Sequence, residues 1–301
     1  MEFKNFDLKA MELLNVQEQK NYFIKYFIPL NNGSHCFYNN GQYEMITDEI
    51  LKKVYLNRCS KKIKEFYLED YKEIKILVYK LNKPLMFDNK INLCPQLKAS
   101  KPYKDFDKNI QNKVKIFLDY INEIIASNNQ DVYNYILKWL SNLCKGNKND
   151  SALVFKPNAK GVGKSTLPTM FRKYVLGENL CLESGSEPLK SKFNSILGGK
   201  LLVYFEELET FSTAEWNSVS STLKRFITSD IISLQKKNQD AYEAENINNY
   251  ILLSNHDIAD DGRRFFVADI NTKRKGDYEY WDNLYKKCLM MKLVLLYIVI
   301  F

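Results

Sequence analysis

The sequence has few histidines and no closely spaced cysteines. Only His35 and His256 occur in 301 residues, and the six cysteines are scattered without any C-x-x-C pair. Protein zinc sites use Cys and His ligands at short, regular spacings, so the sequence argues against a zinc-binding fold. It also suggests no disulfide framework, and a reducing compartment fits it best.

Long apolar runs are also lacking, except at the end of the chain. The N-terminus, MEFKNFDLKAMELL, is charged throughout and is not typical of a signal peptide. The final stretch, LMMKLVLLYIVIF, is shorter than the roughly 20 residues of a membrane span, and no membrane partner is expected. We interpret residues 288–301 as an atypical apolar tail: either a buried last element or the product of a truncated or frameshifted reading frame. A one-nucleotide shift of a permitted coding sequence gives an ordinary amphipathic helix there.

The remaining composition is that of a globular chain with one large or two modest domains. Hydrophobic residues make up 45% and charged residues 27%, and 20 Tyr and 18 Phe can fill a sizeable core. The formal net charge of +8 favours a polyanionic partner without proving one.

Residues 1–108 have the pattern of a small α+β region. Asn39-Asn40-Gly41 is a hairpin turn signal between two short alternating runs, and Asp48 or Thr47 can cap a helix. The elements expected here are a helix over 8–27, strands over 35–38 and 42–46, a helix over 48–56, partial helix over 60–81 and an irregular stretch over 82–105.

Residues 109–148 predict a helical hairpin. Apolar residues recur at helical spacing from Val114 to Ile125, and again from Val132 to Leu140. Ser127-Asn128-Asn129 separates the two runs. The hairpin can be plain core packing or an oligomerisation collar, and spacing alone does not choose between these.

The most informative stretch is SALVFKPNAKGVGKSTL, residues 151–167. An apolar run of strand length, Ala152–Phe155, is followed by a loop with Gly and Lys and then by a segment that can be helical over Leu167–Val175. Strand, loop, Gly-Lys-Ser and helix form the arrangement of a phosphate-binding loop. Lys164 is then expected to reach the β- and γ-phosphates, and the Ser165 hydroxyl to bind Mg²⁺.

One position departs from the usual pattern. Asn158 stands where the first Gly is expected, but Asn tolerates positive φ better than other non-Gly residues, so the loop can still close. The residues expected to bind the nucleotide are Asn158, Gly161, Val162, Gly163, Lys164, Ser165 and Thr166.

A second buried strand is indicated by KLLVYFEEL, which ends in Glu206 and Glu207. Ligands of open α/β sheets bind outside the carboxyl ends of the strands. We assign Glu206 to the metal shell and Glu207 to polarising the attacking water.

Further signals follow in order. A helix over 213–226 precedes a possible strand over 227–234 and an exposed turn, Gln235 to Asn238. An apolar strand over 249–254 ends in Asn255, which can contact the γ-phosphate or the nucleophilic water. Arg263 and Arg264 then precede a strand over 265–270, and an Arg there can stabilise transition-state charge on a neighbour's nucleotide.

In this order, the motifs resemble those of the superfamily three helicases, in the branch of poxvirus-type viral primase-helicases. GVGKST resembles motif A, LLVYFEEL motif B, residues 224–237 motif B′, YILLSN motif C with its sensor Asn, and DGRRFFVADIN the arginine-finger region. The resemblance extends from Gly33 to Tyr285. Ser229 stands where the branch often has Gly. The residues before the helical hairpin resemble the linker region of this branch and not its primase catalytic domain, so we expect either one half of a longer protein or a stand-alone helicase.

The resemblance implies an α/β fold: an AAA+ P-loop ATPase core with a parallel sheet over 149–287, preceded by the hairpin and the α+β region. It implies a DNA helicase that hydrolyses ATP with Mg²⁺ at the subunit interfaces of a hexamer. Lys236 and Lys237 would grip single-stranded DNA in the pore, at a site of viral DNA replication inside the host cell. Forked DNA and a primase domain or protein are further expected partners.

Two other functions stay open. A P-loop nucleotide kinase shares the phosphate loop, although the sequence shows no acceptor site for one. A catalytically impaired nucleic-acid-binding remnant of a primase-helicase is favoured by Asn158 and the unusual tail, but the presence of Lys164, Ser165 and Glu207 argues against it.

Overall fold

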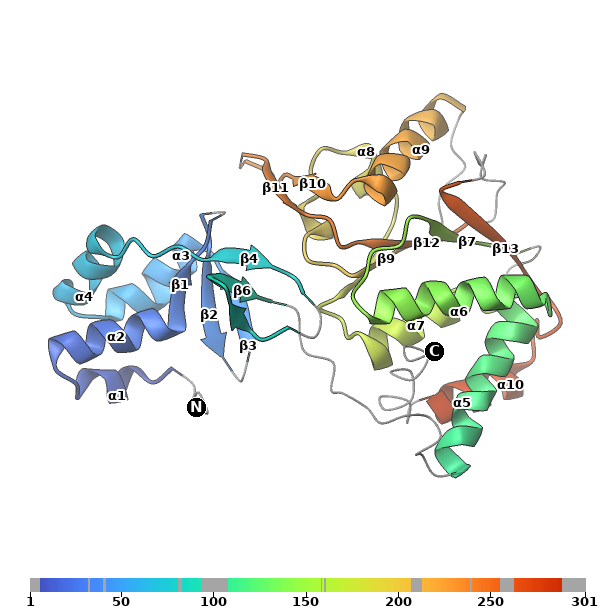
Figure 1. Cartoon of the computed structure of the whole chain (residues 1–301), viewed down its shortest axis with the longest axis horizontal. Coiled ribbons are helices and arrows are strands. Elements are labelled where there is room, and N and C mark those ends of the chain that lie inside the picture. The colour runs from blue at the N-terminus through green and yellow to red at the C-terminus, as the bar shows by residue number, and fades with distance from the viewer. Residues whose placement is uncertain are drawn as a thin grey trace. The chain divides into compact units, whose positions relative to one another are not determined.

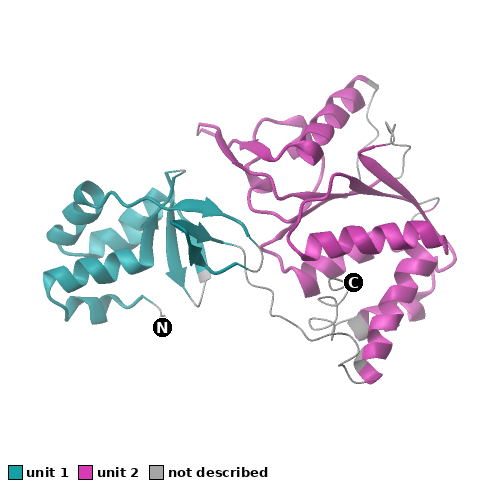
Figure 2. Cartoon of the chain, in the orientation of Figure 1, with its two compact units in different colours: residues 1–96 teal, residues 97–301 magenta. Residues whose placement is uncertain are grey.

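The structure is a computed structural model that describes residues 6–31, 33–39, 42–80, 83–93, 108–157, 159, 161–206, 213–238, 240–254 and 263–288. Asn158, Glu207, Asn255 and the apolar tail from Leu289 onward lie outside the described residues. The chain divides into two compact units, residues 1–96 and 97–301 (Figure 2). Within the described ranges, no helix has both the length and the apolar character needed to cross a bilayer.

Unit 1 is an α+β unit with two three-stranded sheets, ordered β1-β2-β3 and β4-β6-β5. Its core is rich in aromatic rings; Phe23, Phe27 and Phe37 stack in sequence. The helices, including the π-helical turns η1 and η3 and the 3₁₀ turn η2, are α1 (Leu8–Glu12), α2 (Val16–Tyr26), α3 (Asp48–Ile50), η1 (Leu51–Tyr55), η2 (Leu56–Arg58), α4 (Lys61–Glu65) and η3 (Phe66–Asp70). The strands are β1 (Phe27–Pro29), β2 (His35–Asn39), β3 (Gln42–Ile46), β4 (Ile76–Val78), β5 (Met86–Phe87) and β6 (Lys90–Asn92).

Three expectations for unit 1 need correction. The helix predicted over 8–27 is two helices, because Asn15 accepts a hydrogen bond from the Glu18 N–H and the Glu18 carboxylate accepts one from the Asn15 N–H. This capping box starts α2 afresh. The end of the partly helical stretch over 60–81 is strand β4, and the stretch predicted as irregular contains β5 and β6. The β2–β3 hairpin is confirmed, with His35 opposite Ile46.

Unit 2 holds the parallel sheet. Its helical elements are α5 (Lys108–Tyr120), η5 (Ile121–Ile125), α6 (Gln130–Cys144), α7 (Thr166–Met170), η6 (Phe171–Val175), α8 (Glu187–Lys190), η7 (Ser195–Leu197), α9 (Thr213–Thr228) and α10 (Tyr278–Cys288). Its strands are β7 (Ala152–Pro157), β8 (Cys181–Ser184), β9 (Leu202–Phe205), β10 (Ile231–Leu234), β11 (Tyr242–Glu245), β12 (Asn249–Leu253) and β13 (Phe265–Ile270).

Five of these strands form one sheet in the order β13-β7-β12-β9-β8, with every neighbouring pair parallel. The central strands are buried on both faces, as their continuous apolar sequences predict. Val154, Val203 and Leu252 pack on one face with α9 and β10. On the other face, Phe266 stacks on Tyr135 of α6 at 3.8 Å. The α/β class with a parallel sheet is therefore confirmed.

Of the two helices of the hairpin, α6 lies along this sheet and α5 lies beside α10 (Figure 1). The Ser127 hydroxyl donates to the Asp269 carbonyl at 2.5 Å, and the Asn271 N–H donates to the Ile124 carbonyl at 2.9 Å. Both bonds join the hairpin to the end of β13. The two helices are thus packed as part of unit 2, and an assembly role for them stays a prediction.

Unit 2 also differs from the sequence expectations in detail. The strand predicted over 227–234 begins only at Ile231, because α9 continues to Thr228. The edge strand β8, the strand β11 and the helix α10 had no sequence prediction. The strand β8 is short and reads Cys-Leu-Glu-Ser, so it lacks the long apolar run that marks the central strands.

Candidate nucleotide-binding site

In the described part of the loop after β7, two glycines adopt a backbone conformation that residues with side chains rarely adopt. Gly161 and Gly163 have positive φ, 75° and 83°, in the region that favours glycine. The Gly163 carbonyl accepts a hydrogen bond from the Thr166 N–H at 3.1 Å, where the chain turns into α7. The first backbone N–H groups of a helix lack partners within it, so this turn can bind an anion.

Some side chains of the loop are buried in the core, and others are candidates to bind a nucleotide or a metal. Val162 and Thr166 are each only 2% exposed, so both fix the loop to the core. Lys164 and Ser165 are half-buried. Ser165 is the N-cap residue of α7, but its side chain makes no capping hydrogen bond there. A Ser hydroxyl and a Lys amine at a helix start are the groups expected to hold Mg²⁺ and phosphate.

The acidic end of β9 lies at the same edge of the sheet as the loop. The Glu206 N–H donates to the Ser184 carbonyl at 3.0 Å, so it continues the pairing between β8 and β9. Its side chain is half-buried.

The strand order places the phosphate loop and Glu206 at the same edge of the sheet. The strand β12 lies between β7 and β9 and is parallel to both, so the carboxyl ends of all three are adjacent. Lys164 follows β7 and Glu206 follows β9. Ser254 follows β12 directly before the predicted sensor Asn255, and its N–H donates to the Phe155 carbonyl at 3.3 Å.

The predicted arginines do not join this group. The Ala152 N–H donates to the Arg264 carbonyl at 2.8 Å, at the amino end of β7. Phe265 then pairs with Ala152, so Arg263 and Arg264 stand at the opposite edge of the sheet from the phosphate loop. The strand β7 has six residues, which separates the two edges by roughly 15–20 Å. Arg263 is exposed and Arg264 half-buried.

The predicted DNA-contacting lysines lie on a hairpin. The strands β10 and β11 are antiparallel, with Leu234 opposite Tyr242, and Lys236 and Lys237 are exposed in the connecting turn. The base of this turn is fixed by the buried Asn194, whose amide donates to the Ser233 carbonyl and accepts from the Gln235 N–H, each at 3.0 Å.

Sequence reasoning missed the aromatic residues that support the phosphate loop. The Trp281 ring lies so close to Gly163 that a Cβ at this glycine would be 2.1 Å from Trp281 Cη2. The Tyr120 hydroxyl donates to the Gly163 carbonyl at 3.3 Å, and the Thr166 and Tyr285 hydroxyls are 3.2 Å apart. Trp281 and Tyr285 are four residues apart, so they share one face of α10. That spacing is the sequence signal, but it does not say which segment the face covers.

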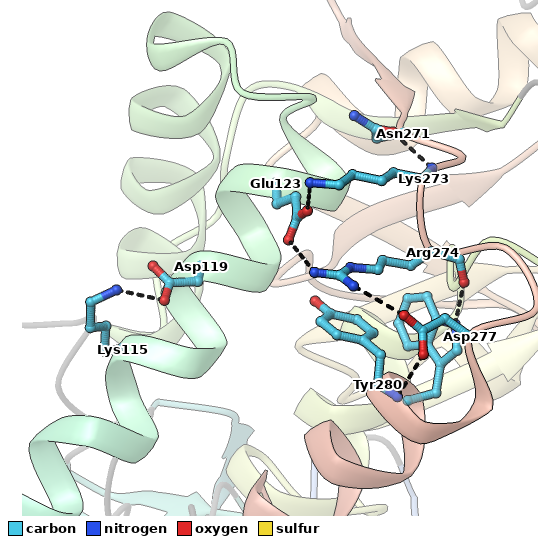
Figure 3. A network of polar contacts seen from close by, with 9 residues as sticks. Lys115, Asp119, Glu123, Asn271, Lys273, Arg274, Asp277 and Tyr280 are labelled. Carbon is cyan, nitrogen blue, oxygen red and sulfur yellow. Dashed lines mark hydrogen bonds and ion pairs between the residues drawn. The ribbon is translucent and has the colours of Figure 1, made fainter.

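A polar network holds α10 in place (Figure 3). The Trp281 Nε1–H donates to the Arg274 carbonyl at 2.9 Å. The Arg274 guanidinium donates to Asp277 at 3.0 Å and forms an ion pair with Glu123 at 3.6 Å, while Lys273 contacts the same Glu123 at 2.7 Å. Residues from the hairpin and from the turn before α10 are therefore joined by charge.

The carboxylates of the network are stabilised in their charged form. The hydrogen bond from Lys273, more than any other contact, lowers the pKa of Glu123 below its usual range. The Asp277 carboxylate accepts the Tyr280 N–H at 3.0 Å at the start of α10, and this bond is the main reason that its pKa is also lowered. An acidic residue at a helix start is favourable, so Asp277 fixes where α10 begins.

A cavity of about 310 Å³ lies elsewhere, beside the edge strand β8. Arg172 contacts Glu183 at 2.7 Å and Glu178 at 3.4 Å, and the Tyr204 hydroxyl donates to Glu183 at 2.6 Å. Burial is the main cause that raises the pKa of Tyr204 to about 12. Because two carboxylates line this cavity beside one arginine, it is not suited to a polyphosphate.

The similarity to known proteins covers most of the chain. Residues 155–264 match the profile of a family described as "Family of unknown function (DUF5906)". The chain is similar to the DNA Primase-polymerase of Nitratiruptor phage NrS-1, at 24% identity over 288 residues. That match covers 89% of this chain but only 38% of the phage protein, so the chain spans less than half the length of this relative.

Solved structures extend the similarity to the fold. An apo structure of the NrS-1 C-terminal region, in its A form, matches with a TM-score of 0.68 at 20% identity, covering 93% of this chain and 68% of that one. A second apo structure of the same region also gives a TM-score of 0.68, covering 94% of this chain. The chain therefore shares its fold with the C-terminal region of a phage replication protein to which its sequence is also similar.

Proposed function

We propose that this chain is the ATP-hydrolysing motor of a viral DNA replication protein and moves along single-stranded DNA as a ring. One observation carries the proposal: the phosphate-type loop after β7, the acidic end of β9 and the end of β12 share one edge of the parallel sheet. Nucleotides bind at this edge in open α/β sheets.

The described residues fit a nucleotide with Mg²⁺. Lys164 supplies positive charge for the β- and γ-phosphates, and the backbone N–H groups at the start of α7 supply donors. Ser165 and Glu206 would supply oxygen ligands to the metal, and the metal would neutralise charge on the phosphates. Glu207 would polarise the attacking water, and Asn255 would contact the γ-phosphate or that water; both roles rest on the positions of these residues in the sequence.

The positions of the two arginines favour a ring-shaped assembly. Arg263 and Arg264 are at the far edge of the sheet from the loop of their own subunit. An arginine that stabilises charge on the transferred phosphate must therefore act on the nucleotide of a neighbouring copy. A hexamer with its active sites between subunits meets this requirement.

The polymer along which the motor is proposed to move is DNA. The similar phage protein is by name a DNA primase-polymerase, and this chain carries a formal net charge of +8. Lys236 and Lys237 are exposed on a turn whose base is fixed, so they can contact phosphates without reading sequence. A primase domain or protein is the proposed partner of the motor.

The test is the ATPase rate with and without single-stranded DNA, for the wild type, Lys164→Ala and the control Lys173→Ala. Lys173 is an exposed lysine on η6, the helical turn that follows α7. We expect hydrolysis that DNA stimulates, a loss of at least about 100-fold in Lys164→Ala because transition-state charge is no longer stabilised, and no change in the control.

Three outcomes contradict parts of the proposal. Equal rates in Lys164→Ala and wild type would remove the phosphate loop from catalysis. Stimulation by a small phosphate acceptor instead of DNA would identify a kinase. Folded protein that binds DNA but never hydrolyses ATP would be a binding remnant.

A further inference from the structure

The aromatic face of α10 lies where a nucleotide on the phosphate loop must continue. Lys164 reaches towards the β- and γ-phosphates, and the backbone N–H groups that follow it cradle the α- and β-phosphates. The nucleoside end of the ligand therefore leaves the loop beside Thr166. Tyr285 is at that residue, with its hydroxyl 3.2 Å from the Thr166 hydroxyl, and Trp281 is one helical turn away against Gly163.

These rings are accessible as well as close. Trp281 and Tyr285 are half-buried, whereas Tyr120 behind them is fully buried. Tyr120 supports Trp281 edge-on, with ring centroids 6.1 Å apart. Trp281 is thus packed against Tyr120, and both Trp281 and Tyr285 keep part of their surface accessible to a ligand.

The orientation of Trp281 is fixed before any ligand arrives. The only hydrogen-bonding atom of its ring, Nε1, donates to the Arg274 carbonyl, and Arg274 is itself held by Glu123 and Asp277 (Figure 3). A ring that is already ordered loses little entropy when a base stacks on it.

We propose that Trp281 and Tyr285 form the nucleoside-binding wall of the site, with the purine base of ATP packed on the exposed part of Trp281. The inference rests on the proposed ATP-binding function and deepens it by naming the residues that recognise the base. Base–aromatic stacking is tolerant of base identity, so the wall selects nucleotides over bare polyphosphates rather than one base over another.

A purely supporting role for Trp281 makes a different prediction. If the ring only braces Gly163, its loss disturbs the loop and weakens every phosphate ligand alike. If the ring contacts the base, its loss weakens ATP and leaves a ligand without a base unchanged. Inorganic tripolyphosphate is such a ligand, because it carries the phosphates alone.

The experiment measures the Kd of ATP and of tripolyphosphate, both with Mg²⁺, by calorimetry on the full chain. The variants are Trp281→Leu, which keeps apolar packing without an aromatic face, and Trp281→Phe, which keeps an aromatic ring. The control is Tyr278→Leu, on the same helix but 86% exposed. We expect Trp281→Leu to raise the Kd of ATP about tenfold, which is about 1.4 kcal/mol, with the Kd of tripolyphosphate unchanged within about twofold, less than 0.5 kcal/mol. Trp281→Phe should recover most of the loss, and the control should change neither.

Fluorescence gives a second readout on the unchanged protein. ATP should quench tryptophan emission in the wild type, tripolyphosphate should not, and the quenching should be absent from Trp281→Phe.

Several results would overturn the inference. Equal weakening of both ligands would make Trp281 a brace of the loop, and tightening of both would make it a cover over the site. An unchanged Kd of ATP in Trp281→Leu, together with absent quenching in the wild type, would mean that Trp281 does not contact the base. A wild type that binds neither ligand would remove the phosphate site and this wall with it, whereas ATP binding without DNA-stimulated hydrolysis would end the motor proposal and leave the wall standing.

Discussion

Replacing Gly163 by alanine perturbs the phosphate loop in two separable ways. The residue has φ of +83°, so any L side chain is strained there. The new methyl group would also lie 2.1 Å from Trp281 Cη2, and the indole must therefore move. Gly161 provides the matched control, because its φ is +75° and a Cβ there meets nothing within 4 Å. The difference between the two alanine variants isolates the contact with Trp281.

The change in the free energy of unfolding can be estimated from the backbone strain and from the contact with Trp281. Alanine in the left-handed region costs about 1–2 kcal/mol, which both variants share. Moving Trp281 adds the cost of overpacking, about 1–3 kcal/mol. It also breaks the hydrogen bond from Nε1 to the Arg274 carbonyl, worth about 1 kcal/mol. We therefore expect Gly163→Ala to lower the free energy of unfolding by about 2–4 kcal/mol more than Gly161→Ala does.

Urea unfolding followed by tryptophan fluorescence suits this comparison. The three tryptophans, Trp139, Trp216 and Trp281, all belong to unit 2, so the signal reports on the unit that holds the loop. In a Trp281→Ala background the extra cost of Gly163→Ala should disappear, as in a double-mutant cycle. Equal destabilisation by the two glycine variants, within about 0.5 kcal/mol, would refute the reasoning.

Three further predictions concern other parts of the chain. Asn249 is 1% exposed and its amide oxygen accepts from the Asn149 backbone N–H at 2.8 Å, so Asn249→Ala should lower the free energy of unfolding by about 3 kcal/mol; a loss below about 1 kcal/mol in urea unfolding would contradict this. Changing Lys236 and Lys237 together to alanine should weaken single-stranded DNA binding and reduce its salt dependence, while the ATPase rate without DNA stays unchanged; an unaltered salt slope in a binding titration would remove the pair from the DNA contact. The pKa of Glu123 is lowered in the folded protein, so its charged form stabilises the folded state at pH values above the usual pKa of 4.5. This contribution is lost as the pH falls through the lowered pKa of Glu123. Glu123→Gln should therefore flatten the acid side of the stability profile, and an identical profile would count against the ion pairs.

Strong local patterns in the sequence predicted much of the fold. The runs Ala152–Phe155, Leu202–Phe205 and Tyr250–Leu253 are strands because continuous apolar residues suit a sheet that is buried on both faces. Alternation and turn chemistry likewise predicted the β2–β3 hairpin. The prediction of a single helix over 8–27 failed because of local hydrogen bonds: a capping box at Asn15 divides a segment that has continuous helical periodicity.

Around the candidate site, the sequence predicted the local structure only where one segment supplies its own geometry. The Gly-Lys-Ser turn is such a segment, and both of its flanking elements are where the pattern places them. Strand order is not written in any single segment, so the sequence could not show that Arg263 and Arg264 are at the opposite edge from the loop. The support of Gly163 by Tyr120 and Trp281 joins residues 161 positions apart in the chain, which no local pattern records.

The support from both sides makes the geometry of the loop depend on elements that precede and follow the sheet. Tyr120 reaches Gly163 from the hairpin, and Trp281 reaches it from α10. Glu123 is one turn from Tyr120 on the same helical run, and it pairs with the segment that fixes Trp281. A shift of the hairpin relative to α10 must therefore break these ion pairs or move the ring from the glycine. The contacts of Tyr120 and Trp281 with Gly163, together with the ion pairs of Glu123 and Arg274, therefore connect the hairpin, α10 and the phosphate loop.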